Sequence, residues 1–380
     1  MRIFCLSFVS SVGTLKEQVF DKRFRLSMAL KTFLPSDFEI RRLVGKQSLL
    51  RIVEWEYYQK KNPTEPAVTV EPGSLACRLY EAILYPNTKQ ETESVFETLE
   101  EDYGVDITSE QLPLSRFLGS LEAPDTFETE YFREQWQRAL PYIEPPKAGH
   151  LFLVFCWEGL STVASYPVNR NNRAWLSTIF LESKFQRRCQ FVKKIMSSSL
   201  EALEFLHRYR IVHLSLGPQS LLLNTTREDQ VHALKVRLRD FGFSRRLSSL
   251  DDDSIRRAYA AGASNPRAIS NYYYAQDIVL LGYVFLMLTF CSFADSVIYQ
   301  KMGYDGLKRL VEDLFQFDFD RLRSYLIQDD SVRDVVRFLD QGNGSGWVFA
   351  RNMLILKRQL RHEQDELIAT ELKNSSFLLK

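Results

Sequence analysis

The chain has 380 residues, of which 45% are hydrophobic and 26% are charged, and its formal net charge is +1. This composition is typical of a globular protein with a sizeable core, and the balanced charge argues against nucleic acid or an anionic membrane surface as the main partner. The five cysteines form no CxxC pair and no cluster with histidine, which argues against a zinc site and a disulfide framework. A soluble protein in an intracellular, reducing compartment is therefore predicted.

Residues 1–36 are expected to lie outside the main fold. An apolar stretch follows Arg2 and is succeeded by serine, glycine and several basic residues. Glu17 and Asp21 depart from the acid-free composition of a transit peptide. We therefore interpret this segment as an N-terminal extension, with a targeting segment as the alternative.

The following part of the chain is predicted to be rich in short strands. Three runs of β-branched, aromatic and aliphatic residues have the length of strands, at 49–58, 74–84 and 151–157. Pro63 marks a turn between the first two runs. The acidic segment 89–103 has apolar residues at helical spacing and predicts a helix.

From residue 168 onward the pattern becomes mainly helical. Residues 191–209 carry apolar side chains at a period of 3.6, and short β-like runs follow at 221–223 and 234–238. Residues 278–294 contain no charged side chain, but this run is shorter than the roughly 20 residues of a membrane span. It predicts a buried core helix and no transmembrane span.

Two motifs in the helical half resemble those of one enzyme family. Residues 211–223 (IVHLSLGPQSLLL) resemble the protein-kinase catalytic loop, H-R-D-L-K-P-x-N, with His213, Leu216 and Pro218 in register. Downstream, Arg239-Asp240-Phe241-Gly242 resembles the D-F-G motif of the same family. The chain is similar to the protein kinase superfamily in a degenerate, pseudokinase-like form.

Three further landmarks fall in the order that this resemblance requires. The helix at 191–209 ends just before the loop, and residues 151–159 stand where the strand and hinge between kinase lobes belong. Asp277 opens the uncharged helix and occupies the place of the buried aspartate that ties the family's catalytic loop to its central helix. A weaker resemblance, to divergent plastid kinase-like proteins of plants and algae, rests on residues 154–164 (VFCWEGLSTVA) and 240–247 (DFGFSRRL), and leaves a plastid or other organelle open.

The resemblance implies an α+β, protein-kinase-like two-lobed fold. It places a β-rich N-lobe over residues 37–156 and a mainly helical C-lobe over 157–360, with a C-terminal tail at 361–380.

The catalytic loop departs from the family at three functional positions. Ser215 replaces the aspartate that accepts the proton of the substrate hydroxyl, and a serine hydroxyl is neutral and far too weakly basic to do so. Gly217 replaces the lysine that neutralises the transferring phosphate, and Ser220 replaces the asparagine that ligates the second metal ion. Loss of the base alone lowers the rate by about 10² to 10⁴.

The nucleotide-binding features are also reduced. Of the glycine-rich loop only Gly45 remains, and Arg78 stands on the strand that should carry the phosphate-binding lysine. By the resemblance, Asp240 is the remaining ligand for Mg²⁺. Binding of ATP and magnesium through Gly45, Arg78 and Asp240 is thus left open.

The sequence therefore predicts a pseudokinase that acts as an interaction or regulatory scaffold, with unidentified protein partners. The alternative is a divergent ATP-dependent Ser/Thr protein kinase with non-standard catalytic residues. A further hypothesis is that Ser248 or Ser249, which follow Arg245 and Arg246, is phosphorylated. The alternative for this segment is an exposed polar loop.

Overall fold

The computed structural model divides the chain into two compact units, Met1–Leu160 and Ser161–Lys380. In the first unit it describes the strands named below and short segments at 113–115, 133–134, 137–138, 141–142 and 159. In the second unit it describes residues 161–166, 181–239, 241, 244–295, 303, 306–359 and 368–379. The division after Leu160 lies close to the predicted boundary at residue 156.

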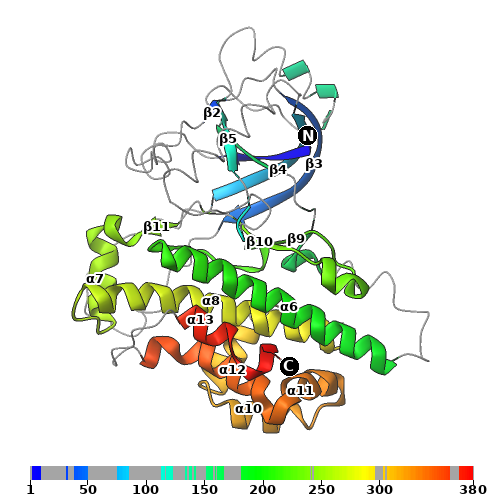
Figure 1. Ribbon diagram of the computed structural model, residues 1–380, viewed down its shortest axis with the longest axis vertical. Helices are drawn as coiled ribbons and strands as arrows, with labels where there is room; N and C mark the ends of the chain where they lie inside the picture. The colour runs from blue at the N-terminus through cyan, green and yellow to red at the C-terminus, as the bar shows by residue number, and fades with distance from the viewer. Residues whose placement is uncertain are drawn as a thin grey trace. The chain divides into compact units, whose positions relative to one another are not determined.

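The first unit contains a six-stranded sheet, in which only the pairing of β2 with β5 is parallel. The strand order is β2-β5-β6-β1-β4-β3. The strands span Arg2–Val9 (β1), Lys31–Thr32 (β2), Phe38–Leu49 (β3), Leu75–Leu84 (β4), Phe117–Glu122 (β5) and Leu151–Cys156 (β6). Figure 1 shows β3 and β4 of this sheet in blue and β5 in teal.

The first strand changes the interpretation of the N-terminal residues. β1 lies inside the sheet, where it pairs antiparallel with β4 on one side and with β6 on the other. The sequence predicted an extension or targeting segment here, because an apolar run near a basic residue resembles a leader. The same run of aromatic, β-branched and aliphatic residues suits a strand that has neighbours on both sides.

The other strand predictions have mixed outcomes. The strands predicted at 74–84 and 151–157 are confirmed as β4 and β6. Of the run at 49–58, only Leu49 lies in the part that the structure describes, as the last residue of β3. The helix predicted at 89–103 lies outside the described residues.

Two long helices organise the second unit. α6 (Leu181–Arg208) confirms the helix predicted at 191–209 and begins ten residues earlier. α8 spans Pro266–Phe293, and every residue from Ala275 to Phe293 is buried. It is apolar and long enough to cross a membrane, but its most apolar stretch of 18 residues is 100% buried. The prediction of a buried core helix is therefore confirmed.

The start of α8 differs from the sequence prediction. Asp277 was expected to open the helix, but it lies well inside it. The helix begins at Pro266, and the side chain of Asn265 caps it by accepting a hydrogen bond from the Ala268 N–H at 2.9 Å. Asparagine at the cap and proline in the first turn are strong start signals, and they outweigh the change in polarity at Asp277.

The C-terminal helices complete the core of the second unit. α11 (Arg333–Leu339) and α12 (Gln341–Gln359) pack on α8, as Figure 1 shows. α13 (Ile368–Lys373) contacts α6, and α14 (Ser376–Leu379) contacts α12. Phe377 is 1% exposed, and its ring lies 5.8 Å from that of Phe285 on α8. Residues 368–379, predicted to be a tail, thus contribute to this core.

Substitution of Gly346 in α12 tests how closely α11 and α12 pack against each other. A Cβ atom at this position would lie 2.7 Å from the Leu339 Cα atom and 2.8 Å from its carbonyl oxygen. Backbone atoms cannot rotate away, so we expect Gly346→Ala to lower the free energy of unfolding by about 2 kcal/mol despite the better helix propensity of alanine. Urea denaturation measures this change.

Gly217→Ala is the matched control. The nearest atom to an added Cβ there is the Gln219 Oε1, at 3.5 Å. Its backbone is extended, so alanine fits without strain and stability should be unchanged or slightly higher. Equal losses in the two variants would show that the α11–α12 approach is not tightly packed.

Candidate functional site

The carboxylate of Asp277 holds the loop that resembles a kinase catalytic loop. The backbone N–H groups of His213 and Leu214 each donate to it at 2.8 Å, to Oδ2 and Oδ1 respectively. Asp277 is 0% exposed. A carboxylate removed from water is costly, and these charge-assisted hydrogen bonds compensate for the lost hydration. The predicted tie between this aspartate and the loop is confirmed.

The sequence analysis missed a third donor to Asp277. His207, in the last turn of α6, donates from Nε2 to Asp277 Oδ2 at 3.0 Å. Tyr274 lies one turn before Asp277 on α8, and its hydroxyl donates to the His207 carbonyl at 3.0 Å. Its ring also stacks on the imidazole, with centroids 4.4 Å apart. The sequence offered no local signal for this donor, because His207 and Asp277 are 70 residues apart in the chain.

The backbone of Leu214 is strained where Asp277 holds it. Its φ is +64°, in the left-handed region that a leucine rarely adopts. Such a conformation costs about 1 to 2 kcal/mol, so it persists only where surrounding contacts fix it. The hydrogen bond from its N–H to Asp277 and the packing of its side chain against Val212 and Tyr273 supply those contacts.

His213 has a structural role. It is 0% exposed, and its Nε2 donates to the Arg239 carbonyl at 2.8 Å. The edge of its ring meets the ring of Phe241, with centroids 5.4 Å apart. His213 therefore connects the loop to the segment that resembles D-F-G.

The three altered loop positions lie in one tight turn. The Ser220 hydroxyl donates to the Ser215 carbonyl at 3.3 Å and accepts from the Gly217 N–H at 3.2 Å. The Ser220 carbonyl accepts from the N–H of Arg239 at 2.9 Å, just before Asp240. Ser215 is 9% exposed. The turn is stabilised by its own hydrogen bonds, and residues 211–223 contain no carboxylate.

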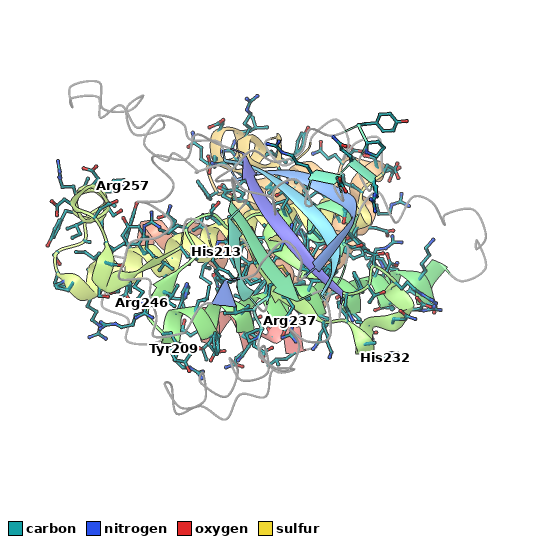
Figure 2. The ribbon with its side chains drawn as sticks, turned by 90° about the horizontal axis from the view of Figure 1, so that it is seen from above. Tyr209, His213, His232, Arg237, Arg246 and Arg257 are labelled. Atoms are coloured by element: carbon teal, nitrogen blue, oxygen red, sulfur yellow. The ribbon has the colours of Figure 1, made fainter. Side chains whose placement is uncertain are left out.

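The segment after D-F-G packs on the start of α8. β11 (Arg245–Arg246) pairs with β8 (Ile211–Val212), which leads into the loop. Leu247 and Leu250 pack with Tyr273 and other apolar residues, and α7 (Asp252–Ala260) follows. Figure 2 shows Arg257 of α7 well away from His213. Ser248 is exposed, and the Ser249 hydroxyl donates to the Arg246 carbonyl at 3.1 Å.

The residues proposed for nucleotide and metal binding are only partly described. Gly45 lies within β3, and Arg78 of β4 pairs with Lys46, its neighbour in the chain. The strand thus runs on through the position of the glycine-rich loop, with an irregularity between Leu43 and Gly45. Asp240 lies outside the described residues, so its role as a magnesium ligand stays a prediction. In the part of the chain that the structure covers, no group of three or more metal-ligating side chains is present.

Comparison with known proteins identifies the class to which this site belongs. The protein kinase domain family matches residues 170–339, which lie within the second unit. A probable inactive serine/threonine-protein kinase of Dictyostelium discoideum is 27% identical over 89 residues. The similarity covers 23% of this chain and 6% of that protein. With the loop geometry above, these matches show that residues 170–339 form a protein-kinase-like region with a degenerate catalytic loop.

Replacement of Asp277 tests whether the loop depends on this carboxylate. Asp277→Asn removes the charge and turns an amide N–H₂ group toward hydrogen-bond donors. We expect the free energy of unfolding to fall by about 3 kcal/mol or more, as when one partner of a buried polar network is lost. Chemical denaturation measures the change.

Asp253→Asn is the matched control for this prediction. Asp253 is an exposed residue of α7 whose carboxylate pairs with Arg256 at 3.2 Å. Exposed ion pairs contribute little, so the loss should stay under about 1 kcal/mol. A similar loss in both variants would contradict the central role of Asp277.

Proposed function

We propose that this protein is a pseudokinase that acts through protein partners as an interaction or regulatory scaffold. The observation that carries the proposal is the contrast within one loop. The contacts that hold the loop, from Asp277 and through His213, are present, whereas Ser215 replaces the catalytic base. A loop that keeps its fold but lacks its catalytic base suits a protein that binds partners through its surface.

The chemistry of the loop supports this proposal. A phosphoryl acceptor needs a carboxylate within hydrogen-bond reach of its hydroxyl, and the loop offers only neutral side chains there. Asp277 cannot substitute, because it is fully buried and accepts hydrogen bonds from two backbone amides and His207. The Ser220 hydroxyl is hydrogen-bonded within the turn, where the family has an asparagine that ligates metal.

The proposal extends to the fold of the whole chain. We infer that the sheet of the first unit corresponds to the N-lobe and the helical unit to the C-lobe. β6 (Leu151–Cys156), just before the division at Leu160, supports this correspondence, because the strand that leads into the hinge is expected there. The partners and the intracellular location, with a plastid or other organelle left open, stay predictions.

A phosphate-transfer assay tests the loss of activity. The full chain is incubated with γ-labelled ATP, Mg²⁺ or Mn²⁺, and casein as acceptor. We expect no more transfer from the wild type than from Asp240→Asn, which lacks the remaining acid of the D-F-G motif. Asp253→Asn is the control for the loss of a carboxylate elsewhere.

The alternative is a divergent Ser/Thr protein kinase that uses Asp240 and an acid outside the loop. Transfer by the wild type that Asp240→Asn abolishes and Asp253→Asn leaves unchanged would establish this alternative and overturn the pseudokinase proposal. The survival of D-F-G in the sequence is the observation that favours it.

Nucleotide binding is tested separately by thermal denaturation. A ligand that binds only the folded state raises the melting temperature, by an amount that corresponds to about 2.7 kcal/mol at 100 times its Kd. Because only Gly45 and Arg78 remain of the phosphate-binding features, we expect ATP with Mg²⁺ to leave the melting temperature unchanged. An increase that is absent in Asp240→Asn would instead assign ATP and magnesium as ligands.

A further inference from the structure

A pocket of about 260 Å³ lies in the helical unit, and none of its lining residues belongs to the catalytic loop. Three segments that are distant in the sequence form its walls. They contribute Gln186, Cys189, Gln190 and Lys193 from α6, then Gln341, Gly342 and Ser345 from the start of α12, and Ser376 and Phe377 from α14.

Lys193 is the charged residue among those that line the pocket. Its Nζ lies 4.8 Å from the centroid of the Phe377 ring, and its side chain is half-buried. In the described parts of the chain no carboxylate lies within ion-pair distance of this ammonium group. Burial accordingly lowers the pKa of Lys193. A partly dehydrated cation without a counter-ion favours an anionic ligand, since the aromatic ring compensates only part of the lost hydration.

The groups beside Lys193 are neutral hydrogen-bond donors. The Gln341 Nε2 donates to the Cys189 Sγ at 3.3 Å. Burial raises the pKa of this thiol to about 11, so it stays neutral at pH 7 and does not act as the counter-ion. A thiol sulfur is a weak acceptor, and a carboxylate oxygen would be a much stronger one for the same amide.

The wall at the start of α12 has a left-handed backbone. Gly342, Asn343 and Gly344 have φ values of +60°, +60° and +79°, all in the left-handed region. The neighbouring Asp340 fixes this corner, because its Oδ1 accepts from the Trp347 Nε1 at 2.7 Å and its carbonyl accepts from the Gly344 N–H at 3.0 Å. Glycine adopts this region without a steric penalty, so the corner turns sharply here, and a wall fixed by these hydrogen bonds lowers the entropic cost of binding.

We propose that this pocket binds the carboxylate of a small organic acid. Lys193 supplies the positive charge, and Gln341 donates a hydrogen bond. A single lysine suits a monoanion better than a phosphate group, which carries a charge of about −1.5 to −2 and pairs best with arginine. The volume corresponds to about nine water molecules of roughly 30 Å³ each, which limits the ligand to a small molecule.

Benzoate and its neutral analogue benzamide test the proposal on the full chain. The two molecules have the same number of non-hydrogen atoms, so a difference between them reports the carboxylate charge. Saturation-transfer NMR titrations give the Kd of each. We expect benzoate to bind about five times more tightly than benzamide, and Lys193→Gln to weaken benzoate about tenfold while benzamide changes less than about twofold.

Two further variants make the result specific to the pocket. Lys194→Gln removes an exposed lysine that does not line the pocket, and it should leave the benzoate Kd unchanged. Gln341→Leu is one non-hydrogen atom smaller and removes the amide donor, and it should weaken benzoate about threefold. Circular dichroism confirms that each variant is folded.

Three results would each overturn this inference: absence of saturable benzoate binding, equal affinities for benzoate and benzamide, or equal losses in Lys193→Gln and Lys194→Gln. If Lys193→Gln does not fold, an unchanged benzoate affinity in Gln341→Leu would overturn the inference instead. The outcome is independent of the phosphate-transfer assay, because the pocket shares no residue with the catalytic loop.

Discussion

The architecture around the degenerate catalytic loop depends on one buried carboxylate. Asp277 lies in the interior of α8, a strongly apolar helix, where an unpaired charge would be very costly. Its oxygens accept hydrogen bonds from two consecutive amides of the loop and from the imidazole of His207. The loop, the end of α6 and the middle of α8 are thereby held together, and Leu214 is kept in a conformation that it would otherwise avoid.

This dependence explains how the loop can persist without catalytic residues. The contacts that determine its shape involve backbone amides, His213 and apolar side chains such as Leu216 and Leu221, none of which takes part in phosphate transfer. The positions that the resemblance assigns to the base, to the lysine that neutralises the transferring phosphate and to the metal ligand hold two serines and a glycine. Ser220 instead stabilises the turn through its hydroxyl. The residues that hold the loop are therefore different from those that the resemblance assigns to phosphate transfer.

The α11–α12 corner combines close packing with an unusual backbone. Gly346 allows the backbone of Leu339 to approach, while the residues before it adopt left-handed conformations that face the pocket beside Lys193. Phe377 belongs both to the aromatic cluster on α8 and to the wall of this pocket. Occupancy of the pocket would therefore act on residues that also stabilise the core of the helical unit.

The sequence by itself determined the features that depend on local order and spacing. The period of α6, the uncharged run in α8, the strands β4 and β6 and the ordered kinase-like motifs all follow from residues close together in the chain. Only the tertiary structure decided that β1 lies inside the sheet, that His207 shares Asp277 with the loop, and that α6, α12 and α14 enclose a pocket. These features join segments that are distant in sequence, and local patterns carry no information about which distant partner a segment meets. The apolar run at the N-terminus shows this, because its composition suits a leader as well as a strand until the neighbouring strands are known.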